Sequence, residues 1–126
     1  MISTVSLVAL GGAVGATARF LVGAGVARLA GPAEFPLAVL SVNIVGSFLM
    51  GVFVVAAAHK GLTHLSPFVT VGLLGGFTTF SAFSLEAVTL MERGQIASAA
   101  AYVALSVGLS IAALMAGLWI ARGIFA

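Results

Sequence analysis

Four long apolar runs occupy almost the whole chain, and they restrict its fold more than any other feature. Crossing the hydrocarbon of a bilayer takes roughly 20 mainly apolar residues in a helix. The four runs reach this length and lie at about residues 3–28, 37–58, 68–91 and 96–121. We therefore expect an all-α integral membrane protein, with one four-helix transmembrane domain over residues 1–126 and short loops.

The composition agrees with a membrane protein and leaves little for a soluble one. Of the 126 residues, 62% are hydrophobic and only 6% are charged, whereas a soluble domain carries roughly 25% charged residues. The first run lacks a preceding basic segment and a clear cleavage site. We interpret it as the first membrane helix, with a cleaved signal peptide as the alternative.

Several classes of function are disfavoured by the residues that the chain lacks. Without cysteine, disulfides and thiolate metal sites are excluded. Five Lys and Arg residues are too few for a nucleic-acid-binding face. No nucleophile–base pair or metal-ligand cluster is visible, and His59 and His64 lie in a polar loop where we expect them to be solvated. We therefore do not expect an enzyme.

Apart from Arg19, the basic residues lie one at each helix boundary and are balanced between the two sides of the membrane. Arg28 and Arg93 fall on one side of a four-helix arrangement, and Lys60 and Arg122 fall on the other. Because an excess of Lys and Arg decides which side faces the cytoplasm, this balance leaves no preferred orientation. It indicates either a chance tie or a chain that inserts both ways and forms an antiparallel homodimer.

The segment "GGFTTFSAFSLE" (75–86) places poor helix formers in the middle of the third run. Gly75 and Gly76 each cost about 1 kcal/mol relative to Ala, and Thr78 and Thr79 are β-branched. We expect the third helix to break near 75–79. Broken membrane helices occur where they are buried in protein or line a cavity, and such breaks commonly bind ions.

Aromatic and polar residues alternate directly after this break. Phe80 and Phe83 are interleaved with Ser81 and Ser84. The two rings either pack in the ordinary way or present their positive edges to an anion. Glu86 follows about one turn later, and a carboxylate within a membrane helix is a functional candidate.

Two polar residues in the first half of the chain each allow two interpretations. Arg19 shares a helix face with the small residues Gly11 and Gly15. We favour pairing of Arg19 with backbone carbonyls over direct contact with a solute. Asn43, early in the second helix, either bonds a neighbouring helix or points its NH₂ donor at a polar pathway.

The fourth run carries hydroxyl groups at a regular spacing. Tyr102, Ser106 and Ser110 recur every four residues, and Ser98 precedes them by one step, which places them on one helix face. A single serine often bonds its own i−4 carbonyl. A run of four on one face favours a pore-lining track.

Three motifs together resemble the Fluc (CrcB) fluoride channel family over nearly the whole chain. They are "GGAVGATARF" (11–20), "VNIVGSFLMG" (42–51) and "GGFTTFSAFSLE" (75–86). The resemblance implies a passive channel that exports cytoplasmic fluoride across the plasma (inner) membrane and lowers its toxicity. It also implies a dual-topology antiparallel homodimer with two pores, which agrees with the balanced charges.

The resemblance also implies specific residue roles. A structural Na⁺ ion would lie at the dimer centre, held by the backbone carbonyls of Gly75 and Thr78. Arg19 would be structural. The fluoride pathway would comprise Asn43, Thr79, Phe80, Ser81, Phe83, Ser84, Glu86, Tyr102, Ser106 and Ser110.

Two other classes of protein remain as alternatives. A small dual-topology multidrug or cation antiporter would also be short and antiparallel, but it would need a membrane-embedded acid in an aromatic cavity, whereas the first helix carries Arg19. Proton-dependent transport would favour it. A non-transporting membrane assembly subunit would use the Gly and Ser stripes only for packing, and failure to move any ion would favour that.

The charge balance predicts that orientation can be imposed. Two Lys residues added to the 59–66 loop should give a single topology, because they create the missing bias. Fluoride transport should then require a co-expressed partner biased the other way. Topology is read from the accessibility of introduced cysteines, and full activity from a demonstrably single-topology population would contradict the antiparallel dimer.

Overall fold

The computed structural model describes residues 1–31 and 35–125, and helices make up nearly all of this part of the chain. The third membrane span is divided into four helical segments. The elements in order are α1 (Ile2–Ala30), α2 (Leu37–Lys60), η1 (Thr63–Leu65), η2 (Pro67–Leu74), α3 (Gly75–Phe77), α4 (Phe80–Glu92) and α5 (Ile96–Phe125). Of these, η1 is a 3₁₀-helix and η2 is a π-helix.

The prediction of four membrane helices is confirmed. Four helices are long and apolar enough to cross a membrane, with the third counted continuously from Thr63 to Glu92. The other three extend slightly beyond the predicted ends, to Ala30, Lys60 and Phe125.

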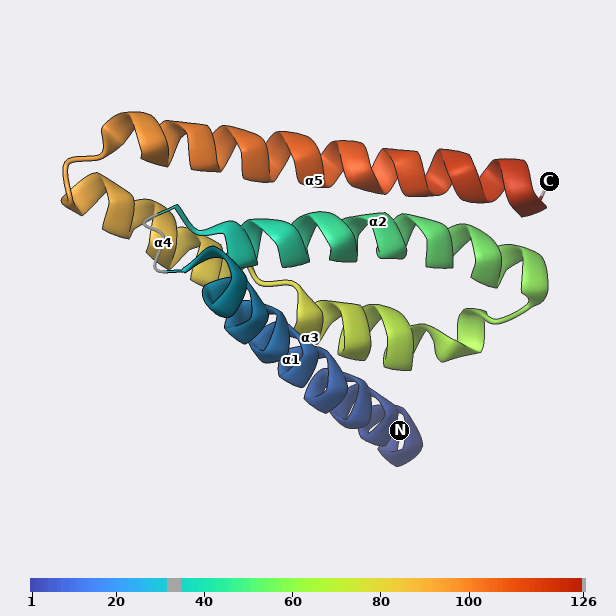
Figure 1. Cartoon of the computed structure of the whole chain (residues 1–126). Helices are drawn as coiled ribbons and strands as arrows, with labels where there is room; N and C mark the ends of the chain where they lie inside the picture. Colours follow the sequence, from blue (N-terminus) through green and yellow to red (C-terminus); the bar gives the residue numbers. More distant parts are fainter. Residues whose placement is uncertain (32–34, 126) are drawn as a thin grey trace.

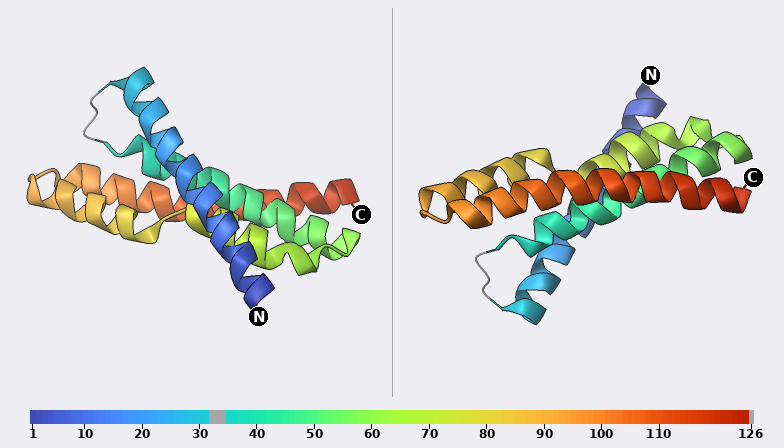
Figure 2. Two further views of the ribbon diagram at one scale, coloured as in Figure 1. Left: turned by 90° about the horizontal axis from the view of Figure 1, so that it is seen from below. Right: turned by 90° about the horizontal axis from the view of Figure 1, so that it is seen from above.

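The helices pack in two groups that meet at the divided third span (Figure 1). α2 and α5 lie side by side and run in the same direction, and α4 packs against the first half of α5. α1 crosses η2 and α3 obliquely, and Figure 2 shows it lying across the other helices from both sides. The divided span therefore contacts α1 through its first half and α5 through its second half.

Glycines permit the close approach of backbones in both groups. A Cβ atom on Gly15 would lie 2.1 Å from the Leu73 carbonyl oxygen, and one on Gly51 would lie 2.3 Å from the Leu114 carbonyl oxygen. Such separations cannot be tolerated, so only Gly fits these positions. Close packing of small residues is a main source of helix association where apolar burial from water is not available.

The third span breaks at Thr78 and Thr79, not at the two glycines. Gly75 is helical (φ −62°, ψ −38°), whereas Thr78 (φ −89°, ψ 161°) and Thr79 (φ −154°, ψ 126°) are extended. Of the four poor helix formers expected to break the span near 75–79, the two threonines are extended and the two glycines remain helical. Gly76 is used for packing instead, because a Cβ there would lie 2.9 Å from the Gly12 carbonyl oxygen.

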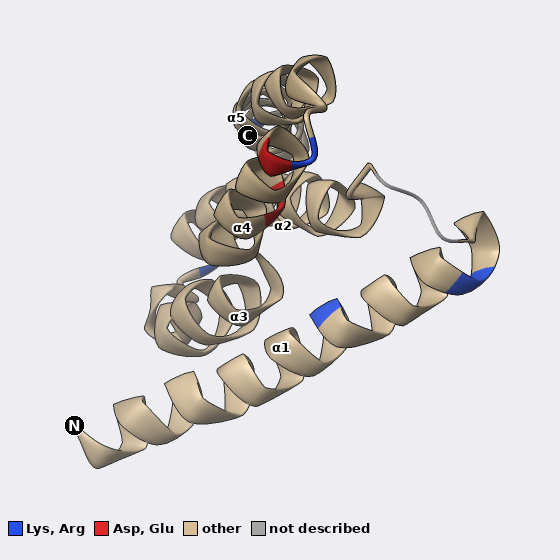
Figure 3. Cartoon of the chain, turned by 90° about the vertical axis from the view of Figure 1, so that its left-hand side faces the viewer, with Lys and Arg blue, Asp and Glu red and all other residues tan. Residues whose placement is uncertain are grey.

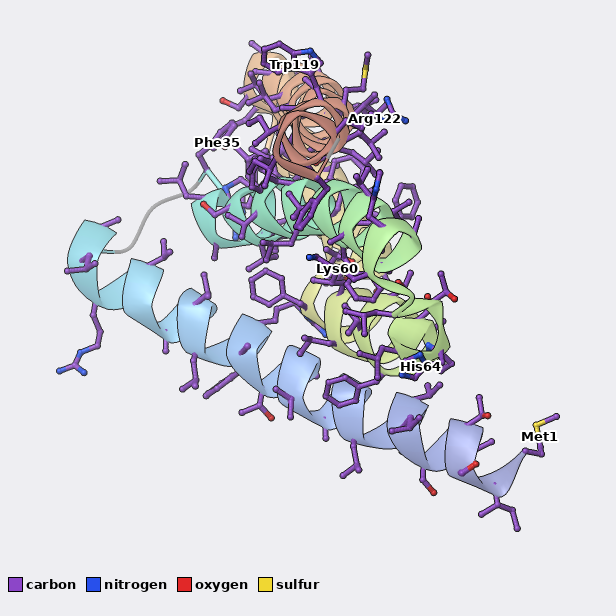
Figure 4. The ribbon with its side chains drawn as sticks, turned by 90° about the vertical axis from the view of Figure 1, so that its right-hand side faces the viewer. Met1, Phe35, Lys60, His64, Trp119 and Arg122 are labelled. Carbon is purple, nitrogen blue, oxygen red and sulfur yellow. The ribbon has the colours of Figure 1, made fainter. Side chains whose placement is uncertain are left out.

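Many large apolar side chains are exposed on the surface of the single copy. Trp119 is 77% exposed and points outward from α5 (Figure 4), and Phe80 is likewise 77% exposed beside the break. The buried core is small and lies between α2, α4 and α5; it comprises Leu40, Phe83, Ala87, Leu90, Ala99 and Tyr102. A single copy therefore leaves much apolar surface for lipid or for a partner.

Charged residues are few and lie mainly at the helix ends (Figure 3). The chain path places Arg28 and Arg93 at one end of the molecule and Lys60 and Arg122 at the other. At the second end, Lys60 Nζ lies 5.7 Å from the ring centroid of Phe125, a cation–π distance. This contact joins the C-terminal ends of α2 and α5.

Candidate functional site

Asn43 of α2 holds the backbone of the broken span with two hydrogen bonds. Its Nδ2 donates to the Thr79 carbonyl oxygen at 3.0 Å, and the Thr79 N–H donates to its Oδ1 at 2.8 Å. Of the two interpretations of Asn43 from the sequence, the structure contains the bond to a neighbouring helix. An amide side chain matches the N–H donor and the carbonyl acceptor of one extended residue, so the pairing satisfies both.

Thr79 also caps the helix that follows it. Its Oγ1 accepts a hydrogen bond from the Ala82 N–H at 3.1 Å, and the Ser81 hydroxyl lies 3.4 Å from the same oxygen. Thr is a favoured N-cap because its side chain satisfies an amide that has no helical acceptor. The threonine pair therefore ends one helix and begins the next.

The break leaves several backbone carbonyls without their helical donors, and for two of them the donor bonds to a side chain instead. In an uninterrupted α-helix the N–H of residue i bonds to the carbonyl of residue i−4. The Thr79 N–H would donate to the Gly75 carbonyl, but it donates to Asn43 Oδ1 instead. The Ala82 N–H would donate to the Thr78 carbonyl, but it donates to Thr79 Oγ1 instead. The carbonyls of Gly75 and Thr78 are the two that the resemblance assigns to a sodium ion.

Arg19 of α1 reaches the same region from the other side. Its Nε donates to the Gly76 carbonyl oxygen at 3.1 Å, which is the backbone pairing that the sequence analysis favoured. Hydrogen bonds from a charged donor contribute about 1.5–3 kcal/mol. The contact ties α1 to α3 next to the break.

A cavity of about 400 Å³ lies between α2, the break, α4 and α5. It brings together six of the predicted pathway residues, which are Asn43, Thr79, Phe80, Phe83, Ser106 and Ser110. Thr78, and Ser47 one turn after Asn43, also line it. The described residues that line the cavity are all uncharged, and its polar groups are amide, hydroxyl and backbone groups.

The other predicted pathway residues lie outside this cavity. Ser81 is exposed, and the Ser84 hydroxyl donates to the Phe80 carbonyl of its own helix at 3.0 Å. Tyr102 is completely buried. Glu86 lines a second cavity of about 540 Å³, to which Arg19 also contributes.

Four buried polar atoms have no hydrogen-bond partner among residues 1–31 and 35–125. They are Glu86 Oε2, Tyr102 Oη, Ser106 Oγ and Ser110 Oγ. Buried polar groups normally have a partner, and water or an ion commonly supplies it where the protein does not. Three of the four belong to the hydroxyl stripe predicted on the fourth helix, so the stripe faces the interior with its hydrogen-bonding capacity unused.

A row of aromatic rings connects this stripe to the cavity. The ring centroids of Phe80 and Phe83 are 5.4 Å apart, those of Phe83 and Tyr102 are 5.2 Å apart, and those of Tyr102 and Phe35 are 5.6 Å apart. Separations of 4.5–7 Å are typical of interacting rings. Tyr102 therefore supports Phe83 from behind, although it does not line the cavity.

Phe35 and Gly46 were missed by the sequence analysis. Phe35 packs edge-on against Tyr102 with an interplanar angle of 86°, but an isolated aromatic residue before Pro36 carries no pattern that would reveal this contact. Gly46 lines the cavity beside Thr78. Its place three residues after Asn43, on the same helix face, is the signal that could have identified it.

Comparison with known proteins gives consistent results over the full length of the chain. Residues 6–118 match the family model described as "CrcB-like protein, Camphor Resistance (CrcB)". A protein of Ruegeria sp. named "Fluoride-specific ion channel FluC" is 68% identical, with 98% of each chain covered. Proteins of the same name from Cereibacter sphaeroides and Agrobacterium fabrum are 64% and 50% identical; the comparisons cover 98% of both chains in the first case, and 96% of this chain and 98% of the relative in the second.

The Asn43 clamp predicts a large loss of stability on Asn43→Leu. The substitution keeps the number and branching of the side-chain heavy atoms but leaves the N–H and the carbonyl of Thr79 without partners. Unsatisfied buried groups cost about 1–3 kcal/mol each, so we expect a loss of about 2–6 kcal/mol, measured as a lower melting temperature of the purified protein in detergent.

Ser41→Ala is the matched control for this prediction. Ser41 is exposed on the same helix and donates only to the Leu37 carbonyl of that helix, at 2.7 Å. Its melting temperature should remain close to that of the wild type. Equal melting temperatures for Asn43→Leu and Ser41→Ala would contradict the clamp.

Proposed function

The chain belongs to the CrcB family, and we propose from this premise that it is a passive, fluoride-selective channel that exports fluoride across a plasma membrane. The observation that carries the proposal is the 68% identity, over 98% of both chains, to a relative named a fluoride-specific ion channel. The chain would act by conduction and not by catalysis.

The chemistry of the first cavity suits a small, strongly hydrated anion. Its lining includes the Ser106 and Ser110 side chains and the rings of Phe80 and Phe83. These groups can replace part of a hydration shell as hydrogen-bond donors or positive ring edges. Conduction requires binding that is strong enough for entry and weak enough for exit. Neutral donors meet this requirement because they contribute no fixed cation that would trap the ion.

A second, antiparallel copy would complete this site. Phe80 lines the cavity but is 77% exposed in one copy, so a partner packed over it would enclose the ring. The balanced basic residues at the two ends allow the partner to be inverted. Each dimer would then contain two such cavities in opposite orientations.

A structural sodium ion at the dimer centre would satisfy the carbonyls freed by the break. The Gly75 and Thr78 oxygens have each lost their helical donor, as described above. Two copies would offer four such oxygens, a donor set that suits a hard monovalent cation. The ion would supply charge that the carbonyls need inside a membrane, where unsatisfied backbone groups are costly.

The antiporter alternative is less compatible with where the acid lies. It requires a carboxylate that can bind a cation in an aromatic cavity. Glu86 lines the second cavity with Phe20, but the guanidinium-bearing Arg19 lines it too and would repel a cationic substrate. Liposomes loaded with fluoride separate the alternatives. We expect passive release of fluoride but not chloride from liposomes that contain the protein, and proton-coupled transport of a cation would favour the antiporter instead.

The two phenylalanines should be needed for conduction. Phe80→Ile and Phe83→Ile keep apolar bulk but remove the polarised ring edge, so the initial rate of fluoride release should fall sharply while the protein remains folded. Phe53→Ile, on α2 and outside both cavities, is the control and should conduct normally. Normal rates in all three variants would show that the two rings only pack and do not contact the ion.

Sodium should stabilise the protein without passing through it. We expect a lower melting temperature and slower fluoride release when N-methylglucamine replaces sodium on both sides of the membrane, because the freed carbonyls then lack their cation. In a separate set of liposomes prepared in sodium buffer, trapped radioactive sodium should not be released. Unchanged stability and activity in sodium-free buffer would refute the ion.

A further inference from the structure

Gly46 of α2 lies directly against the side chain of Thr78. A Cβ atom on Gly46 would lie only 2.2 Å from Thr78 Cγ2 and 3.4 Å from Cδ2 of Phe77. A carbon–carbon separation of 2.2 Å is far inside van der Waals contact. The Thr78 methyl group therefore occupies the space that any other residue at position 46 would need.

This contact differs in kind from the other close glycine contacts. In the part of the chain that the structure describes, every other glycine whose added Cβ would meet an atom within 4 Å has backbone atoms as its nearest neighbours. Gly51 and Gly117, for example, would meet backbone atoms of the facing helix, so they allow two helices to approach. Gly46 instead faces side chains at the break, and the Thr78 methyl group is the nearest of them.

Thr78 has little freedom to avoid an added carbon. Threonine is restricted at χ1 by its branched Cβ, and its Oγ1 donates to the Leu74 carbonyl oxygen at 2.9 Å. The Thr78 N–H bonds to the same carbonyl at 3.0 Å. Rotation about χ1 would lose the hydroxyl bond, so an added carbon at position 46 would displace the Thr78 backbone.

We propose that Gly46 is a positioning residue for the broken span. Asn43 holds Thr79 through two hydrogen bonds, and Gly46, one turn later on the same face of α2, seats the Thr78 methyl group. Together they place the break against α2 and so set where the Thr78 carbonyl and the adjoining cavity wall lie. The proposal rests on the proposed function, because it assigns Gly46 a part in shaping the fluoride and sodium sites.

A double-mutant cycle tests the contact between Gly46 and the Thr78 methyl group directly. Thr78→Ser removes Cγ2, the atom in conflict, and keeps the hydroxyl that bonds to Leu74. Four proteins are compared: wild type, Gly46→Ala, Thr78→Ser and the double variant. Each is measured for its melting temperature in detergent and for its initial rate of fluoride release from liposomes.

The expected result is strong coupling between the two positions. Gly46→Ala in the wild-type background should lower the melting temperature, as overpacking of a tight site does, and the displaced cavity wall should slow fluoride release by about tenfold. In the Thr78→Ser background the same change should have little effect, because the methyl group is gone. Equal effects of Gly46→Ala in both backgrounds, or none in the wild-type background, would overturn the proposal.

Gly108→Ala is the matched control. An added Cβ at Gly108 of α5 would meet nothing within 4 Å, yet the substitution brings the same gain in helix propensity. It should leave stability and release unchanged. If the wild type itself releases no fluoride, the proposed function fails, and the melting temperatures of the four proteins still decide whether Gly46 seats Thr78.

Discussion

The rest of the structure depends on how the backbone of Thr78 and Thr79 is satisfied within a membrane. Two extended residues in a membrane span expose peptide groups that hydrocarbon cannot hydrogen-bond. Asn43 pairs with both polar groups of the Thr79 backbone, and the Thr79 hydroxyl caps the next helix. Arg19 supplies a further donor to the Gly76 carbonyl. Helices α1 and α2 thus each use one polar side chain to support the same break.

This arrangement requires α1 and α2 to approach the third span closely, and glycines at both contacts allow this approach. α1 lies on the first half of the third span because Gly15 and Gly76 leave room for facing backbone atoms. On the other side, Gly46 leaves room for the Thr78 methyl group. Larger residues at these positions would separate the helices and move the polar side chains out of hydrogen-bonding range of the break.

The cavity next to the break is lined both by polar groups that have hydrogen-bond partners in the protein and by polar groups that have none among the described residues. Asn43 and Thr79 have partners within the protein and form a fixed wall, whereas the Ser106 and Ser110 hydroxyls have none among the described residues. Free hydroxyls beside a rigid wall can bind a small polar species without first breaking an internal bond. The ring of Phe83, whose centroid lies 5.2 Å from that of Tyr102, also lines the cavity.

Individual residues show which parts of the structure were predictable. Length and hydropathy determined the four membrane spans, since the hydrocarbon thickness imposes the same demand on any helix. The hydroxyl stripe on the fourth helix followed from a period of four, which is local. Tyr102 shows the limit of that inference, because the same period could not say that its ring is buried between Phe35 and Phe83 while Ser106 and Ser110 line the cavity.

By itself, the sequence determined the four apolar spans, the region of the break and the family motifs, because helix periodicity, propensity and span length are properties of neighbouring residues. Only the tertiary structure decided that the break lies at the threonines and not at Gly75 and Gly76. Glycine and threonine are both poor helix formers, so propensity does not tell which of them ends the helix. The packing of the neighbouring helices does. Gly76 lies in the helix where α1 packs so closely that no side chain would fit. Thr79 is extended where Asn43, 36 residues away in the sequence, bonds to its backbone.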